Sequence, residues 1–326
     1  MISNAIIKVG DVREKLKEIA SNSIQSVVTS PPYWALRDYG HDKQIGLEQT
    51  PDAYIAEMVA VFREVHRVLA DDGTLWLNVG DSYTPTGKGS TKSNLNVNTH
   101  GYLQQTPGQS AKETHLDRTL FKSGTRPKEL VGIPWRLAFA LQADGWYLRQ
   151  DIIWHKPNPM PESITDRCTK AHEYLFLLSK SPRYYFNNEA IKEPALWADD
   201  NRAGQGRLTY HGKRQGQSGS GQEAFVSIKE KRNKRDVWTI PTKPFKGAHF
   251  AVMPEALVEP CILAGSKPDD IILDPFMGSG TVAVVALQNN RNFIGCELND
   301  DYIAIAENRI AENGLLYSEL LIERKP

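Results

Sequence analysis

The sequence is poor in cysteine and contains no long apolar run. Its 326 residues include only three cysteines, Cys168, Cys261 and Cys296, whose spacing fits neither a zinc site nor a disulfide framework. No segment approaches the roughly 20 apolar residues that span a bilayer, and the first residues form no apolar leader. These absences argue against a membrane protein, a metal-dependent module and a secreted disulfide scaffold, and they predict a cytoplasmic protein.

The chain also lacks a net charge, which at first argues against nucleic-acid binding, since 39 basic residues balance 39 acidic ones. The positive charge is concentrated locally, however. Residues 201–235 hold nine Lys or Arg against two acids, and residues 82–128 hold seven against two. Both segments are polar with little apolar periodicity, so we expect long functional loops there, with an ordinary solvated surface as the alternative.

A short proline motif follows residues 24–28, which are typical of a buried parallel strand. The motif is Ser30, Pro31, Pro32 and Tyr33. Two prolines fix φ and donate no hydrogen bond, so the chain should leave the sheet as a stiff turn. The Pro31 carbonyl would then face outward beside the Ser30 hydroxyl and the Tyr33 ring. Such a site can hold a planar base by its amino group, although the motif alone also fits a plain strand-to-loop junction.

A glycine-rich loop near the other end of the chain forms the second motif. It follows a predicted strand at residues 271–273 and opens a helix. Gly278 and Gly280 let the backbone approach a ligand, Thr281 can cap the helix, and Glu297 ends the next strand, where it can bind two ribose hydroxyls. The predicted ligand-binding residues of this region are Asp274, Pro275, Phe276, Gly278, Ser279, Gly280, Thr281 and Glu297.

The same loop fits a dinucleotide fold, so an NAD-dependent dehydrogenase is a competing interpretation. Gly278, Gly280 and Ala283 have the required spacing, with an acid 19 positions after Gly278. Asp274 would repel a pyrophosphate, however, and too little chain follows to complete a dinucleotide site. A carboxylate in that place suits a cationic ligand end, such as the amino group of a methionine moiety.

The two motifs, in this order, resemble those of the β-group DNA amino-methyltransferases, which use S-adenosylmethionine to methylate cytosine N4 or adenine N6. Further segments resemble the family in the same order, so that the resemblance covers most of the chain. They are residues 9–11, 23–33, 73–81, 151–186 and 249–255. The resemblance implies a prokaryotic or phage-encoded enzyme that binds S-adenosyl-L-methionine, with Asp11 contacting its adenine, and needs no metal. It also implies double-stranded DNA as substrate, and leaves open a cognate restriction endonuclease and a homodimer.

The implied fold is α/β, with a doubly wound, mostly parallel seven-stranded sheet and long DNA-facing loops. The apolar periodicity agrees. Ser30, Asp81, Asp274 and Glu297 all end or follow predicted strands, so they should converge on one crevice. The predicted strands are residues 6–9, 24–28, 75–79, 151–154, 174–178, 271–273 and 292–296. The predicted helices are residues 54–69, 134–144, 254–263, 282–288 and 301–313.

Three regions follow from the resemblance. Residues 1–186 form a catalytic half, which includes a flap at residues 82–128. Residues 187–245 form the candidate target-recognition region, and residues 246–326 form the cofactor-binding half. The predicted DNA-binding residues are Lys229, Lys231, Arg232, Lys234 and Arg235, and the predicted base-pocket residues are Trp34, Trp154 and His172.

The expected chemistry depends on the poor nucleophilicity of an exocyclic amino group, whose lone pair is delocalised into the ring. The Pro31 carbonyl and the Ser30 hydroxyl oxygen would accept its two N–H bonds and draw the nitrogen toward tetrahedral geometry. Tyr33 would stack on the base, which must be flipped out of the duplex. Ser before Pro-Pro-Tyr resembles the cytosine-N4 enzymes, and adenine N6 is the second choice.

Other activities remain open at this point. Pro260-Cys261 is the dipeptide of C5-cytosine methylation, but it lies in a predicted helix and favours a buried core cysteine. His172 and Glu173 could act as an acid–base pair or shape the pocket wall. Methylation of RNA or of a protein amide poses the same chemical problem, and a non-catalytic DNA-binding module is disfavoured by the intact glycine loop.

Overall fold

The computed structural model describes most of the chain, and each of the three predicted regions falls partly outside it. The described residues are 3–36, 41–84, 124, 126–195, 231–242, 252–313 and 318–324. Outside this part lie residues 85–123 and 125 of the predicted flap, residues 196–230 (with Lys229) and 243–245 of the candidate target-recognition region, and residues 249–251. The chain divides into two units, one of Met1–Asn187 with Asp236–Pro326 and one of Asn188–Arg235.

A nine-stranded sheet forms the centre of the first unit among the described residues. Its order is β11-β1-β10-β9-β2-β3-β5-β4-β8. Its strands are β1 Ser3–Val9, β2 Ile24–Thr29, β3 Leu69–Val79, β4 Tyr147–His155, β5 His172–Ser179, β8 Val237–Thr239, β9 Ile271–Asp274, β10 Asn292–Glu297 and β11 Ser318–Arg324. Every pairing in this sheet is parallel except the two made by β5. The predicted α/β class with a mostly parallel sheet is confirmed, but the predicted count of seven strands is wrong.

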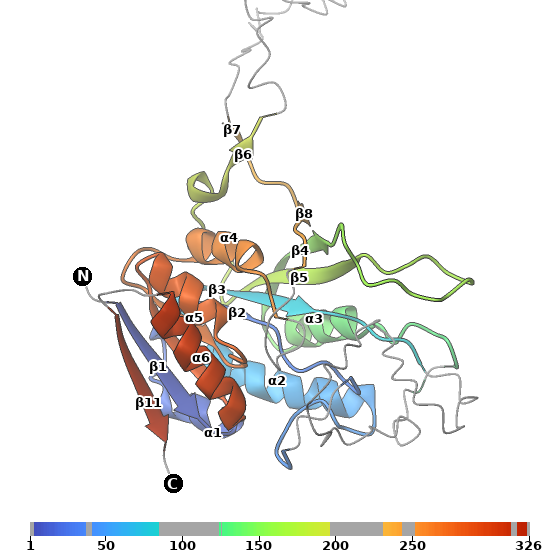
Figure 1. Cartoon of the computed structure of the whole chain (residues 1–326), viewed down its shortest axis with the longest axis horizontal. Coiled ribbons are helices and arrows are strands. Elements are labelled where there is room, and N and C mark those ends of the chain that lie inside the picture. The colour runs from blue at the N-terminus through green and yellow to red at the C-terminus, as the bar shows by residue number, and fades with distance from the viewer. Residues whose placement is uncertain are drawn as a thin grey trace, which may run out of the picture. The chain divides into compact units, whose positions relative to one another are not determined.

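The helices cover both faces of the sheet, as a doubly wound fold requires. They are α1 Val12–Lys15, α2 Pro51–Val68, α3 Ile133–Ala143, α4 Glu255–Gly265, α5 Thr281–Gln288 and α6 Asp300–Glu312, with a short 3-10 turn at Leu16–Glu18. The β2-α2-β3 and β9-α5-β10 crossovers step in opposite directions along the sheet, so right-handed connections place α2 and α5 on opposite faces. α3 packs beside α2, and α4 beside α5 (Figure 1).

The main element that differs from the sequence pattern is β3. It begins at Leu69, directly after α2, and not at residue 75 as predicted. The pairing with β2 shifts between Ile24 and Ser26, which leaves extra residues of β3 bulged. Asp71, Asp72 and Gly73 lie in this bulge, and their turn-like composition hides the strand.

The core lies between the sheet and its helices. On α2 the side chains of Tyr54, Met58, Phe62 and Val65 are fully buried at three- and four-residue spacing, as the amphipathic pattern predicts. Cys261 is also buried, inside α4, where its thiol donates to the Leu257 carbonyl. This agrees with a core cysteine.

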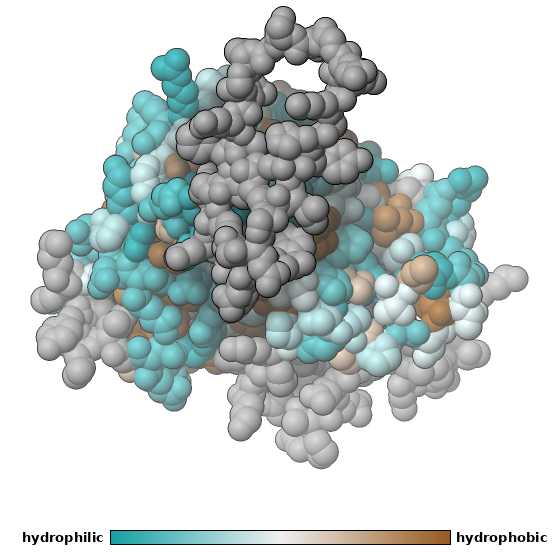
Figure 2. All heavy atoms as spheres, turned by 90° about the horizontal axis from the view of Figure 1, so that it is seen from above, coloured by the Kyte–Doolittle hydropathy of each residue, from teal (hydrophilic) through white to brown (hydrophobic). Residues whose placement is uncertain are grey.

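Polar side chains dominate the described surface on the face shown in Figure 2, where brown areas are small and scattered among teal. Among the described residues no helix is both long and apolar enough to span a bilayer.

The second unit is small in its described part. It contains a 3-10 turn, Glu189–Ile191, and the antiparallel strands β6 Glu193–Pro194 and β7 Lys231–Arg232. Glu193 lies between two guanidinium groups, with Arg232 Nε at 2.8 Å and Arg235 Nε at 2.6 Å.

Candidate active site

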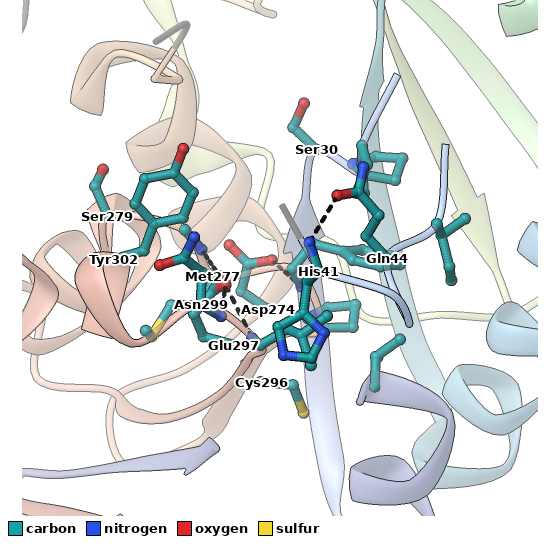
Figure 3. A pocket seen from close by; sticks show the side chains of 18 of the residues that line it. Ser30, His41, Gln44, Asp274, Met277, Ser279, Cys296, Glu297, Asn299 and Tyr302 are labelled. Atoms are coloured by element: carbon teal, nitrogen blue, oxygen red, sulfur yellow. Dashed lines mark hydrogen bonds between the residues drawn. The ribbon is translucent and has the colours of Figure 1, made fainter. Parts of the chain in front are cut away.

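One pocket gathers the two sequence motifs. It lies where β1, β2, β9 and β10 end, and it is lined from one side by Ser30 through Tyr33 and from the other side by the glycine loop. In Figure 3, Ser279 and Tyr302 lie opposite Ser30 and Gln44, with Asp274 and Glu297 between them. The predicted convergence on one crevice therefore holds for Ser30, Asp274 and Glu297.

Asp81 is the exception to this convergence. It does not line the pocket. Its carboxylate accepts backbone N–H bonds from Ser82 at 2.9 Å, Gly132 at 3.0 Å and Ile133 at 3.1 Å, and so it caps the start of α3. Burial raises the pKa of Asp81, while the charge of Lys170 and these N–H groups oppose the rise.

Asp274 is a buried carboxylate at the bottom of the pocket, with 1% of its surface exposed. The Thr29 hydroxyl donates to its Oδ1 at 2.6 Å and the Phe276 N–H at 3.0 Å. Burial raises the pKa of Asp274 to about 7, the two hydrogen bonds oppose the rise, and the charge of Glu297 adds to it. A cationic ligand group beside this carboxylate would offset its burial.

Glu297 serves the glycine loop as well as the pocket. Its Oε2 accepts the Gly278 N–H at 2.8 Å, and its Oε1 accepts the N–H groups of Leu298 at 2.9 Å and Asn299 at 2.8 Å. Burial raises the pKa of Glu297, and these N–H groups oppose the rise. The side chain is thereby fixed at the strand end, where sequence reasoning placed a ribose-binding acid.

The turn into α5 is built by glycine and not by a threonine cap. Gly280 is the N-cap residue of α5 with φ of 75°, and no side chain caps this end. The predicted capping role of Thr281 is wrong, because Thr281 already lies in the helix and its hydroxyl accepts a bond from Arg309 at 2.9 Å. Arg309 also binds the carbonyl and hydroxyl of Ser279, both at 2.9 Å. Arg309 of α6 thus holds the glycine loop and the start of α5 in place.

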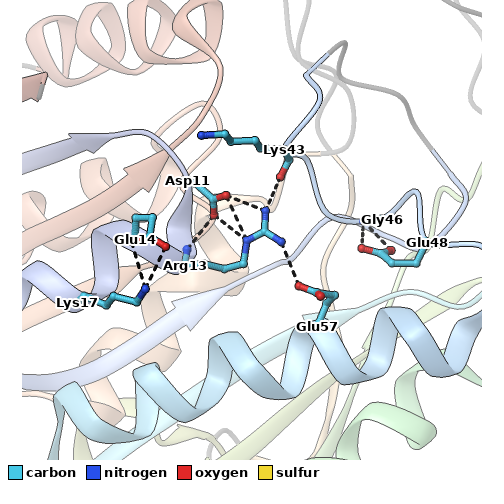
Figure 4. A network of polar contacts seen from close by, with 8 residues as sticks. All are labelled: Asp11, Arg13, Glu14, Lys17, Lys43, Gly46, Glu48 and Glu57. Carbon is cyan, nitrogen blue, oxygen red and sulfur yellow. Dashed lines mark hydrogen bonds and ion pairs between the residues drawn. The ribbon is translucent and has the colours of Figure 1, made fainter. Parts of the chain in front are cut away.

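Asp11 lies at the pocket edge and is bound by Arg13 (Figure 4). Both Asp11 oxygens accept bonds from the Arg13 side chain, with Nη2 to Oδ2 at 2.7 Å, and Oδ1 also accepts the Arg13 N–H. Burial alone would raise the pKa of Asp11, but the hydrogen bonds and the charge of Arg13 hold this pKa below its usual value. The same guanidinium donates to the Lys43 carbonyl at 3.0 Å and to Glu57 at 3.1 Å.

Residues 41–48 connect this network with Ser30–Tyr33, the candidate catalytic turn, and we name them the strap. His41, Lys43, Gln44 and Ile45 line the pocket. Farther along, the strap carbonyls of residues 46 and 48 accept the Ala35 N–H and the Trp34 indole N–H, both at 2.8 Å. The strap is therefore bonded to the Asp11 side and to the Ser30–Tyr33 side of the pocket.

In the candidate catalytic turn the two proline carbonyls differ in their hydrogen bonding. The Pro32 carbonyl accepts the Tyr54 hydroxyl at 2.8 Å, whereas in the described part of the chain the Pro31 carbonyl has no hydrogen-bond donor. The Tyr33 hydroxyl donates to Glu173 at 2.8 Å. Burial raises the pKa of Tyr33 well above its usual range, and the Glu173 charge adds to the rise, while a side-chain interaction with Ser30 opposes it.

The predicted base-pocket residues lie in three different environments. Trp34 is 4% exposed and packs in the core beneath the catalytic turn, so it supports this turn instead of lining the pocket. Trp154 is also buried, and its indole donates to the Ile240 carbonyl at 2.9 Å. His172 is half-buried at the start of β5 and packs edge-on against Tyr174. Burial and the charge of Lys170 lower the pKa of His172.

Sequence reasoning missed several residues of the site. Tyr54 and Arg309 gave no signal, because each lies in a helix and its partner is distant in sequence. Arg13 binds the nearby Asp11, but its bonds to the Lys43 carbonyl and to Glu57 join residues 30 and 44 positions away. Glu173 was noted only beside His172. Its hydrogen bond with Tyr33 becomes visible when β5 is placed next to β3.

Residues 24–308 match the model of a protein family described as DNA methylase. The chain is 45% identical over 309 residues to the Type II methyltransferase M.Cfr9I of Citrobacter freundii, covering 95% of this chain and 88% of the relative. It is 46% identical over 306 residues to M.SmaI of Serratia marcescens, covering 93% and 90%.

Two solved structures share the fold at low sequence identity. The cytosine-N4-specific PvuII DNA methyltransferase aligns with a TM-score of 0.61 and 18% identity, over 97% of this chain and 89% of that one. A putative DNA modification methylase of Thermus thermophilus, solved with S-adenosyl-L-methionine, aligns with a TM-score of 0.58 and 23% identity, over 99% and 100%.

Proposed function

The chain belongs to the DNA methylase family that modifies exocyclic amino groups, and on this premise we propose that it is a cytosine-N4 methyltransferase of a restriction-modification system. Its cofactor is S-adenosyl-L-methionine. The observation that carries the choice of cytosine is Ser30, which opens the catalytic turn where a longer carboxylate or amide side chain would reach further into the pocket. The cytosine-N4 specificity of the PvuII enzyme, which has the same fold, supports this choice.

The pocket residues fit the cofactor by their chemistry. Asp274 offers a carboxylate to the cationic amino group of the methionine moiety, and Glu297 offers a fixed acceptor to ribose hydroxyls. Phe276 supplies an apolar wall and the backbone of Gly278 allows close approach, whereas Gly280 does not line the pocket and packs against Ala306 of α6. When bound, S-adenosylmethionine supplies an electrophilic methyl group.

The catalytic turn would activate the amino nitrogen by orienting it. The Pro31 carbonyl and the Ser30 hydroxyl oxygen accept its N–H bonds, which disfavours conjugation of the lone pair with the ring. These contacts strengthen as the nitrogen becomes tetrahedral, so they lower the barrier more than they tighten binding. The proton left on the nitrogen is acidic after transfer, so a strong general base is not required.

DNA would be held by the two basic segments, with the base flipped into the pocket against Tyr33. We propose that residues 187–245 read the target sequence and that Lys229, Lys231, Arg232, Lys234 and Arg235 contact phosphates. Trp154 and His172 are proposed to lie near the base. The Type II relatives favour pairing with an endonuclease that cuts the same sequence.

The test is modified-base sequencing of DNA from a host without methylation of its own that expresses the wild-type chain. We expect one short sequence to carry N4-methylcytosine throughout the genome. The Ser30→Ala variant should lower the modified fraction while cofactor affinity, measured by calorimetry, stays the same. N6-methyladenine at one sequence would overturn the choice of base, and an unmodified genome would overturn DNA as substrate.

A further inference from the structure

The hydroxyl of the catalytic tyrosine is tethered to a distant strand. Tyr33 follows β2, and its hydroxyl donates at 2.8 Å to Oε2 of Glu173 on β5, 140 residues further along the chain. β3 lies between these two strands in the sheet. The bond therefore links the catalytic turn, which follows β2, to β5, a strand that does not pair with β2.

The carboxylate of Glu173 is itself held in place. Its other oxygen, Oε1, forms an ion pair with Lys156 Nζ, and the two side chains are only 10% and 9% exposed. The Lys156 ammonium lies 4.2 Å from the centre of the Trp154 ring. A buried pair of this kind gains little net stability over apolar side chains of the same size, so stability alone does not account for it.

The Tyr33 ring is also restricted from one side by bare backbone. A Cβ atom added at Gly80 would lie 2.6 Å from Tyr33 Cε2, so the ring packs directly against the end of β3. The hydroxyl lies 3.5 Å from Asn78 Oδ1, and the Asn78 amide is held in turn by the Tyr174 carbonyl at 3.1 Å. With the hydroxyl tethered and one side packed, the ring keeps a single orientation.

We propose that Glu173 is a positioning residue for methyl transfer, which holds the Tyr33 ring in the plane that receives the flipped base, while Lys156 fixes the carboxylate. This inference rests on the proposed function, since it assigns the tyrosine ring to the target base. A stacking platform contributes most when its orientation is set before the base arrives, because ordering it afterwards would cost binding energy.

The test is a double-mutant cycle of Tyr33→Phe and Glu173→Ala on a duplex that carries the sequence methylated by the wild-type enzyme. Each single variant should lower kcat by roughly 10- to 100-fold, as expected for losing a hydrogen bond to a charged group. The double variant should be no slower than the slower single variant, because both remove the same bond. Glu173→Gln keeps an acceptor oxygen and should retain more activity than Glu173→Ala.

A matched control exists in the segment between β4 and β5. Glu162 is as buried as Glu173, at 9% exposed, and pairs with Arg167 at 2.7 Å. Glu162→Gln should lower the melting temperature about as much as Glu173→Gln does and leave kcat unchanged. In all variants cofactor affinity, measured by calorimetry, should equal that of the wild type.

The inference is overturned if the effects of Tyr33→Phe and Glu173→Ala on kcat multiply, or if Glu162→Gln slows turnover as much as Glu173→Gln. Wild-type activity on a different base or acceptor would instead contradict the proposed function. The cycle can then be measured on that acceptor, so the two failures are distinguishable.

Discussion

Asp274 and Glu297 are neighbouring carboxylates whose pKa values are both raised by burial, yet their surroundings differ. Glu297 accepts three backbone N–H bonds. Asp274 accepts one hydroxyl and one N–H bond, and its pKa rises to about 7. The ligand-free protein therefore keeps a proton on Asp274 that an unfolded chain loses near its ordinary value, so this group's contribution to stability falls as pH rises toward 7.

Cofactor binding should show the opposite dependence on pH. A cationic group beside Asp274 favours the ionised carboxylate, so affinity for S-adenosylmethionine should rise between pH 6 and 8, with release of a proton on binding near the lower end. Calorimetry in two buffers of different ionisation enthalpy measures both quantities. Asp274→Asn should bind more weakly and lose the dependence. Affinity that falls with pH in the wild type would contradict this assignment.

Gly280 combines a left-handed backbone conformation with a close contact between helices, which favours glycine at this position. Its φ is 75°, and an added Cβ would lie 2.9 Å from Ala306 Cβ on α6. Gly145 offers a matched comparison, since its φ is 107° and an added Cβ would meet nothing within 4 Å. Gly145→Ala should cost about 1 kcal/mol through strain alone, and Gly280→Ala about 1–3 kcal/mol more through overlap. Urea unfolding of both variants measures the difference, and equal losses would show that the contact with α6 relaxes freely.

For single residues, the sequence predicts the position of those whose chemistry is set by their immediate neighbours in the chain. Ser30, Pro31 and Asp274 lie where the motifs place them, because a strand end and a proline turn leave few alternatives. Asp81 and Thr281 were assigned wrongly, since their roles depend on α3 and α6, which come close only in the folded chain.

The strap is the element that joins the two sides of the pocket, and Arg13 is its link to the cofactor side. Arg13→Met removes the bonds to Asp11, Glu57 and the Lys43 carbonyl. Because the guanidinium is 35% exposed, we expect a loss of about 1 kcal/mol, or roughly fivefold weaker cofactor binding, with a larger fall in kcat.

Arg63→Met is the control for this substitution. Arg63 pairs with Asp144 at 2.6 Å on the surface of α2, so removing its guanidinium should change neither the cofactor affinity nor kcat. Tight cofactor binding and normal turnover in Arg13→Met would show that the strap keeps its place without this link.

Elements with strong periodicity were predicted within a few residues, and short or charged ones were missed. α2 and β10 carry continuous apolar patterns. β8 has only three residues, and β11 is an edge strand that itself contains Glu319, Glu323 and Arg324, so neither alternates clearly enough to be recognised. Their strand character comes from pairing with β4 and β1, which local sequence does not encode.

For the whole molecule, zero net charge and DNA binding are compatible because the basic residues are concentrated in segments. In the second unit Glu193 pairs with Arg232 and Arg235, so part of this charge is balanced internally.

Reversing the charges of Lys231, Arg232, Lys234 and Arg235 should weaken DNA binding and reduce the slope of affinity against salt by roughly 0.9 for each lost phosphate contact. Glu193→Gln should strengthen binding. Fluorescence anisotropy at several salt concentrations measures both effects. An unchanged slope would indicate that the phosphate contacts lie in residues 82–128 instead.

We propose that the pocket transfers a methyl group to the N4 nitrogen of cytosine in DNA. The most direct measurement is mass spectrometry of nucleosides from duplex DNA that the purified chain has treated with methyl-labelled S-adenosylmethionine. We expect label in N4-methylcytosine, and much less of it for Ser30→Ala. Label in N6-methyladenine or C5-methylcytosine, with none in N4-methylcytosine, would contradict it.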